Sequence, residues 1–141
     1  MEKLVFDGKE AVFGRLATVV AKNLLKGNSV DVINCEDIII SGNKQAFFNE
    51  LVAKKSMGGG SSLKGPNYSR LTDKLIRRMI RGMLPWDRPK GKDAYKRLRC
   101  YIGRGKLTEE DLKKVKSFEE NRKPMKYFSI KEITGALRWI R

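Results

Sequence analysis

Apolar residues in the first third of the chain change between strand-like and helical spacing. Lys3–Phe6 is a short, mainly apolar run, and Ser29–Asn34 alternates and is rich in branched side chains, so each predicts a strand. Between them, Val12–Lys26 carries apolar residues on one broad face at helical spacing, which predicts a core helix. The order strand, helix, strand predicts a parallel crossover unit.

The pattern continues through the middle of the chain. Ile38–Ile40 is a third β-prone run, and Asn43–Lys55 predicts a second helix whose Phe47 and Leu51 face inward. The next stretch, Met57–Pro66, is rich in glycine and serine. Such a composition predicts a mobile loop rather than a packed element.

A third helix is predicted over Asp73–Met83, with Thr72 as its N-cap and Pro85 shortly after its end. One face of this helix is apolar, beginning at Leu75. The opposite face carries four cations at helical spacing, namely Lys74, Arg77, Arg78 and Arg81. A merely solvated face would intersperse both signs of charge, so this face predicts contact with an anionic partner.

The elements after this helix are expected to be short. They are a helix over Asp93–Leu98, a strand over Arg99–Ile102, and helices over Glu109–Ser117 and Ile130–Trp139. The last two follow capping-box patterns, at Thr108 with Asp111 and at Ser129 with Glu132. The loop Asn121–Lys126 connects them. Because the charge of this tail is mixed, we expect it to serve packing or protein contact.

The overall charge narrows the class of partner. The chain has 141 residues, with 31 Lys and Arg against 16 Asp and Glu, so its formal charge is 31 − 16 = +15. Cations that dock on phosphates release condensed counterions, which makes nucleic acid the favoured partner. An anionic membrane is the weaker interpretation, because no apolar run approaches the roughly 20 residues needed to span a bilayer. The start of the chain lacks a secretory pattern, so we expect a soluble, intracellular protein.

The residue types argue against common catalytic and metal chemistry. The chain has no histidine, and its two cysteines, Cys35 and Cys100, stand far apart. We therefore expect no metal and no Ser-His or Cys-His nucleophile, and we interpret both cysteines as reduced, buried small hydrophobes. Neither Gly103–Thr108 nor Gly58–Gly60 fits a phosphate-loop signature, so no cofactor and no small-molecule substrate are expected.

Three ordered motifs resemble one known family. They are Gly14-Arg15-Leu16-Ala17, then Val32-Ile33-Asn34 leading through Ile38–Lys44, then Arg81–Pro85 followed by Lys90-Gly91 and Arg97–Gly103. Their order and spacing over about Lys3–Gly103 are similar to the thirteenth large-subunit ribosomal protein family, in its archaeal type. The segment Gly103–Lys106 departs from the family pattern, which leaves the path of the tail open.

The resemblance implies a fold and a function. The fold is a three-layer α/β/α domain with a central, mostly parallel four-stranded sheet, over residues 1–103, followed by a C-terminal helical extension over residues 104–141. The function is that of a structural constituent of the large ribosomal subunit, which binds large-subunit rRNA, meets neighbouring ribosomal proteins and supports early subunit assembly. The resemblance implies a cytoplasmic, ribosome-associated protein with no catalytic activity.

The expected rRNA-binding residues combine the cationic helix face with the motif after it and with other basic positions. They are Lys44, Lys54, Lys55, Lys64, Arg70, Lys74, Arg77, Arg78, Arg81, Gly82, Pro85, Arg88, Lys90, Lys92, Lys96, Arg97 and Arg99. Trp86 either stacks on an unpaired base or caps the core, and Arg15 either meets RNA or pairs within the fold. The glycine-rich loop is either a linker or a backbone that approaches RNA closely.

Two other functions remain open from the sequence. The same basic face would suit a free-standing RNA-binding translational regulator, which needs no particle. A nucleic-acid-processing enzyme would need Glu50 or Asp87 to hold magnesium beside a phosphate. No arrangement of residues in the sequence supports the enzyme.

Overall fold

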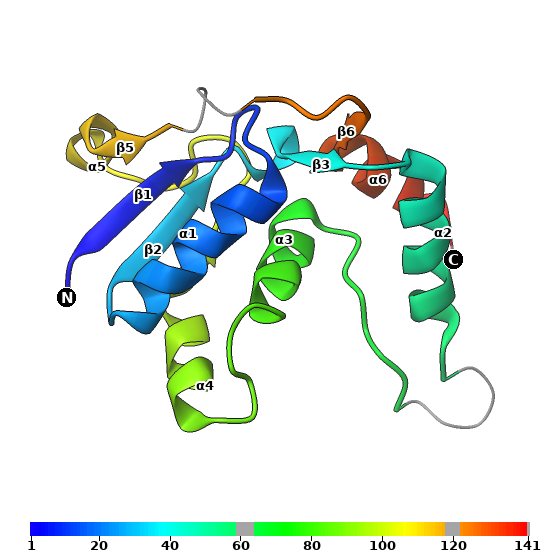
Figure 1. The fold of residues 1–141 in the computed structure, drawn as a ribbon, viewed down its shortest axis with the longest axis horizontal. Coiled ribbons are helices and arrows are strands. Elements are labelled where there is room, and N and C mark those ends of the chain that lie inside the picture. Colours follow the sequence, from blue (N-terminus) through cyan, green and yellow to red (C-terminus); the bar gives the residue numbers. More distant parts are fainter. Residues whose placement is uncertain (59–63, 118–121, 141) are drawn as a thin grey trace.

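The structure, a computed structural model, describes residues 1–58, 64–117 and 122–140 (Figure 1). It begins with the predicted crossover unit: β1 (Lys3–Asp7), α1 (Phe13–Leu25) and β2 (Ser29–Ile33). The two strands are parallel and pair along their whole length, from Lys3 beside Ser29 to Asp7 beside Ile33. Five buried α1 residues face the sheet side of the molecule, as the helical spacing predicts: Leu16, Ala17, Val20, Ala21 and Leu24.

The central sheet has four parallel strands in the order β4, β2, β1, β5. β4 (Leu98–Cys100) pairs with β2 on one side, and β5 (Val115–Lys116) pairs with β1 on the other. The mostly parallel four-stranded sheet is therefore confirmed. The expected strand Arg99–Ile102 begins one residue earlier and ends at Cys100.

The fourth strand of the central sheet, β5, comes from a segment that was predicted to be helical. A helix was expected over Glu109–Ser117, but α5 (Glu109–Lys113) ends after five residues, and Val115 then pairs with Val5 of β1. α5 buries none of its residues, so no apolar face holds the chain in a helix there. The open edge of β1 offers backbone hydrogen bonds instead.

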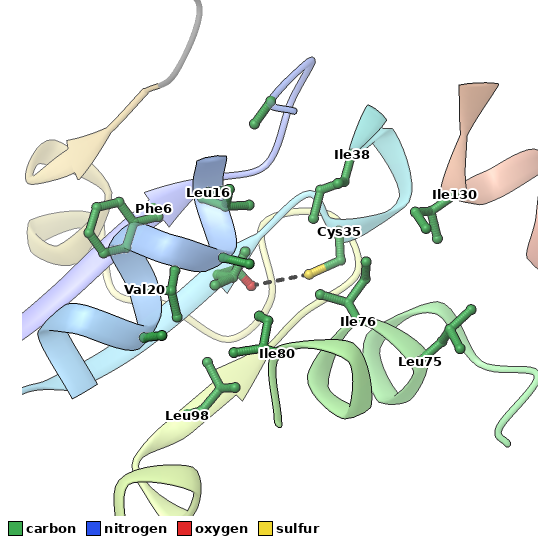
Figure 2. Packing of buried hydrophobic residues seen from close by; sticks show 14 of the residues in the cluster. Phe6, Leu16, Val20, Cys35, Ile38, Leu75, Ile76, Ile80, Leu98 and Ile130 are labelled. Carbon is green, nitrogen blue, oxygen red and sulfur yellow. Dashed lines mark hydrogen bonds between the residues drawn. The ribbon is translucent and has the colours of Figure 1, made fainter. Parts of the chain in front are cut away.

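Three helices pack on one face of this sheet, and the short helix α5 lies on the other. On one face, apolar side chains of β1 and β2 meet α1, α3 (Thr72–Arg81) and α4 (Pro89–Lys96), with Phe6, Leu16, Ile76, Ile80 and Leu98 in one cluster (Figure 2). On the other face, Lys3 forms ion pairs with Asp31 of β2 and with Asp111 of α5. The three-layer α/β/α arrangement is confirmed, with α5 as a thin outer layer.

A second, two-stranded sheet lies beside the first. The run Ile38–Ile40 lies outside the central sheet: after the short 3₁₀ helix Cys35–Asp37, β3 (Ile39–Ser41) pairs antiparallel with β6 (Tyr127–Ser129). β6 was not predicted from the sequence, because it is only three residues long. Its Phe128 is buried and joins the main core cluster.

Two helices flank this second sheet (Figure 1). α2 (Lys44–Ser56) begins after Asn43, whose side chain accepts a hydrogen bond from the Gln45 backbone N–H, and it ends one residue after the prediction. α6 (Ile130–Leu137) begins with the predicted capping box of Ser129 and Glu132. Buried side chains of α6 belong to the same core cluster as those of α1 and α3.

Three local predictions need correction. Thr72 is the first residue of α3 rather than its N-cap, because its hydroxyl lies 3.0 Å from that of Thr134 on α6 and shares a hydrogen bond with it. The helix expected over Asp93–Leu98 is α4, which starts at Pro89, where proline's fixed φ suits the first helical position. At α5 the capping box is only half formed: the Thr108 side chain caps no backbone N–H, but the Asp111 carboxylate accepts hydrogen bonds from Thr108. The hydrogen bond from Lys3, and after it these bonds, lower the pKa of Asp111.

Both cysteines are free, as interpreted from the sequence, but only Cys35 is buried as expected; each lies on an element that contacts α3. Cys35 is buried, and its thiol donates to the Val32 carbonyl at 3.6 Å (Figure 2). Cys100 is half-buried, and a hydrogen bond with the Cys35 thiol, together with burial, raises its pKa well above the ordinary value. A thiol with a raised pKa carries little thiolate at neutral pH and is a poor nucleophile.

Candidate nucleic-acid interface

The cationic surface is built on α3, whose orientation is fixed by its apolar side. Leu75, Ile76 and Ile80 are fully buried against the core, and the Thr72 hydroxyl bond anchors the first turn to α6. Because residues three and four apart lie on one side of a helix, the opposite side presents the basic residues. Arg77, Arg78 and Arg81 are half-buried, and Lys74 is exposed.

Each of the three arginines lies against an aromatic ring. The Arg77 guanidinium carbon is 4.5 Å from the ring centroid of Tyr95, that of Arg78 is 4.1 Å from Tyr68, and that of Arg81 is 4.8 Å from Trp86. Trp86 and Tyr95 pack edge to face, with their centroids 5.2 Å apart. Stacking on an aromatic face suits the planar guanidinium and limits its motion.

These cations have no acidic partners in the described ranges. The ion pairs of the structure join other residues, and none includes Lys74, Arg77, Arg78 or Arg81. The Arg77 guanidinium donates one long hydrogen bond, 3.4 Å, to the Tyr95 carbonyl, and its buried Nε has no partner. Like charges held together without neutralisation favour an anion at this place.

The arginine side chains line a cavity of about 390 Å³, which we term the arginine cavity. Its lining residues are Asn67, Ser69, Lys74, Arg77, Arg78, Arg81 and Tyr95. All the charged groups in this lining are positive, and the neutral ones add amide and hydroxyl donors. Guanidinium groups match the oxygens of a phosphate bidentately, so the cavity has the chemistry of a phosphate site.

The turn after α3 is held by close backbone packing. Leu84 is buried, and the Pro85 carbonyl accepts a hydrogen bond from the Arg88 N–H at 3.1 Å. α4 approaches this turn so closely that a Cβ on Gly91 would lie 2.0 Å from the Pro85 oxygen. The motif Arg81–Pro85 with Lys90-Gly91 therefore has a structural role: its close packing positions Trp86 against the Arg81 guanidinium.

The structure does not bring every predicted residue to the α3 face. Arg97 turns away and donates to the Leu24 carbonyl of α1 at 2.9 Å. Together with Arg99 and Lys96 it lines a separate cavity of about 400 Å³, which also contains the Asp31 carboxylate. Arg88, Lys90 and Lys92 are exposed on the turn and on α4, and Lys96 pairs with Asp93 at 3.4 Å.

The basic residues of α2 already have partners within the fold. Lys44 pairs with Glu132 at 2.7 Å, and Lys54 pairs with Glu50 one turn earlier. Lys55 donates to the Ile140 carbonyl at 3.4 Å, and burial, followed by the charge of nearby Arg70, lowers its pKa.

The remaining predicted rRNA-binding residues lie in the segment before α3 and at its C-terminal end. Arg70 is half-buried in the segment before α3, and Lys64 is exposed at the edge of a described range. Gly82 caps the C-terminal end of α3. The centre of the glycine-rich loop, residues 59–63, lies outside the described residues, as does Asn121 of the predicted connecting loop.

Trp86 takes a position different from the two considered, whereas Arg15 takes one of the two positions considered for it. Trp86 is 38% exposed and serves as a platform for Arg81, so it does not cap the core. Arg15 is exposed and donates to the Arg122 carbonyl at 3.3 Å, which is a pairing within the fold. Glu50, which was considered as a magnesium ligand, forms an ion pair with Lys54. No cluster of metal-binding side chains occurs among the described residues.

Sequence reasoning missed the aromatic and polar residues of the site. Tyr95 stands within the basic run that was recognised, so its position among cations could have marked it as a residue of the site. Tyr68, Asn67 and Ser69 lie in an irregular segment with no charge pattern to mark them.

No helix in the described part of the chain has the length and apolar character to cross a membrane.

The fold and the site together define a small, basic α/β protein whose cationic helix face is held in place by aromatic rings. Residues 1–107 match the family model described as ribosomal protein L13. The chain therefore belongs to the ribosomal protein L13 family, as the three motifs indicated.

Archaeal relatives share much of the sequence. The large ribosomal subunit protein uL13 of Methanopyrus kandleri is 48% identical over 109 residues, which cover 77% of this chain and 67% of the relative. The protein of the same name from Archaeoglobus fulgidus is 35% identical over 136 residues, covering 94% and 86%. That of Methanocaldococcus jannaschii is 38% identical over 112 residues, covering 77% and 81%. The archaeal type is consistent with these matches.

Proposed function

We propose that this protein is a structural constituent of the large ribosomal subunit, that it binds large-subunit rRNA through the α3 face, and that it supports early subunit assembly. One observation carries the proposal: three guanidinium groups are stacked on aromatic rings and line one cavity that contains no carboxylate. The family's name and the +15 charge agree with it. The role is structural, cytoplasmic and ribosome-associated, without catalysis.

The direct test removes the three guanidinium groups. We expect Arg77→Ala, Arg78→Ala and Arg81→Ala together to weaken binding to large-subunit rRNA and to lower the slope of log affinity against log salt by about one unit per lost phosphate contact. The matched control removes three exposed cations elsewhere, at Lys113, Lys114 and Lys116, and should change the slope much less. Equal effects of both triple variants would refute a localised contact surface.

Fractionation tests the particle itself. On a sucrose gradient the protein should migrate with large subunits and their early precursors, and the triple arginine variant should remain near the top. A mainly free pool of the wild-type protein, with tight binding to a single messenger RNA, would instead support the free-standing regulator.

We assign contact with neighbouring ribosomal proteins to the segment after residue 103. Trp139, two residues after the end of α6, is 90% exposed, which is unusual for so large an apolar side chain. A photo-crosslinking amino acid at position 139 should capture a ribosomal protein in purified subunits. Crosslinks to rRNA alone would refute this assignment, and the boundary at residue 103 stays a prediction.

A further inference from the structure

A second cavity adjoins the arginine cavity and shares two of its residues. It has a volume of about 380 Å³ and lies between α1, α2 and α3. Its lining residues are Phe13, Phe47, Glu50, Leu51, Lys54, Tyr68, Arg78, Met79, Arg81 and Gly82. We term it the aromatic cavity. Arg78 and Arg81 line both cavities and therefore form the wall between them.

The two cavities differ in the ligand chemistry that they favour. The arginine cavity has four cations and no carboxylate, which suits a phosphate. The aromatic cavity has three aromatic rings and two further apolar side chains, and it also contains the Glu50 carboxylate. Lys54 and the shared Arg78 and Arg81 line it as well, and Lys54 forms an ion pair with Glu50. What distinguishes this cavity is therefore its aromatic and apolar surface, which suits an uncharged aromatic group better than a second phosphate. Its volume lies in the range of about 300–1,000 Å³ typical of small-ligand sites.

Two ring contacts hold the walls of the aromatic cavity in place. The ring of Phe47 packs against Phe128 with centroids 5.4 Å apart, and the Arg78 guanidinium covers the Tyr68 ring at 4.1 Å. At the rim, Glu50 supplies hydrogen-bond acceptors and Lys54 supplies donors. Aromatic walls with polar groups at the rim are the elements with which proteins hold an unpaired base and read its edge.

We propose that the aromatic cavity binds one unpaired nucleobase, while the adjoining arginine cavity holds the backbone phosphate next to it. This inference rests on the proposed function, because it places a nucleotide of the bound RNA at the α3 face. The different linings of the two adjoining cavities carry it: the phosphate of a nucleotide faces four cations with no carboxylate, and its ring faces three aromatic rings and two further apolar side chains. Continuous duplex keeps its bases stacked and could fill only the arginine cavity.

The test compares a paired RNA hairpin with four hairpins that each carry one bulged A, C, G or U. We expect the full-length protein to bind at least one bulged hairpin about tenfold more tightly than the paired parent, as stacking of one base permits. A bulged 2-aminopurine should also change its fluorescence on binding. Equal affinities for the five hairpins would overturn the inference, but not the proposed function.

Variants locate the base within the protein. Tyr68→Leu and Phe13→Leu remove rings from the aromatic cavity on two different elements, and each should lower the ratio of bulged to paired affinity several-fold. Tyr95→Leu is the matched control, because Tyr95 lines only the arginine cavity, and it should weaken both hairpins equally. If the ratio survives both test variants, the base binds elsewhere and the inference is wrong. Failure to bind any hairpin or rRNA would instead count against the proposed function.

Discussion

The backbone oxygen of Pro85 occupies the place where a side chain on Gly91 would begin, 2.0 Å from an ideal Cβ. The atom in the way belongs to the backbone, so no flexible side chain can move aside. The same oxygen accepts the hydrogen bond from Arg88 that closes the turn. The packing of α4 against this turn therefore depends on the absence of a side chain at position 91.

Gly91→Ala should accordingly destabilise the fold. Overpacking of this kind typically lowers the free energy of unfolding by about 1–3 kcal/mol, which urea denaturation would measure. The control is Gly135→Ala in α6, where a Cβ meets nothing within 4 Å. That variant should raise stability by about 0.5–1 kcal/mol, because alanine loses less backbone entropy in a helix. A neutral Gly91→Ala variant would contradict the close packing.

Replacing the arginines by lysines separates charge from geometry. Arg77→Lys, Arg78→Lys and Arg81→Lys keep three positive charges but remove the planar groups that stack on Tyr95, Tyr68 and Trp86. We expect the salt slope of rRNA binding to stay near that of the wild type while the affinity at fixed salt falls about tenfold or more. Wild-type affinity in the lysine variant would show that charge alone suffices.

The buried carboxylate of Asp31 predicts a pH dependence. Burial raises its pKa above the ordinary 3.8, although Lys3 and then Arg99 oppose the shift. The native state therefore holds its proton more tightly than the unfolded state, so the contribution of Asp31 to stability falls as pH rises from about 3.8 through the raised pKa.

Urea unfolding of the wild type and of Asp31→Asn between pH 3 and 7 would measure this contribution. The difference in unfolding free energy should shift in favour of the asparagine variant as pH rises through that window. A difference that moves the other way would mean that the ion pair with Lys3, whose Nζ lies 3.6 Å from the carboxylate, outweighs the burial.

The cationic face was predictable because a helix repeats its sides at a fixed spacing. The positions of Leu75 and Ile76 fix which side is buried, so Arg77, Arg78 and Arg81 had to lie opposite. For the same reason the crossover unit and the helix α1 match their predicted ranges within a residue or two.

Other features depend on contacts between segments that no local pattern encodes. Tyr68 reaches Arg78 from an irregular segment, and Arg97 is drawn away by the carbonyl of Leu24, 73 positions earlier. The strand at Val115 exists because the edge of β1 is available, not because two residues have a strong strand preference. The sequence around a basic residue therefore predicts that it lies in a basic region, but not in which direction its side chain points.

The pairing of β5 with β1 and of β6 with β3 has a consequence for the order of synthesis. Val115–Lys116 and Tyr127–Ser129 complete sheets whose partner strands, at residues 3–7 and 39–41, leave the translating ribosome long before them. During that interval two strand edges have open hydrogen-bonding groups, which other chains can pair with. A nascent chain of this protein thus stays vulnerable to aggregation until residue 129 has emerged.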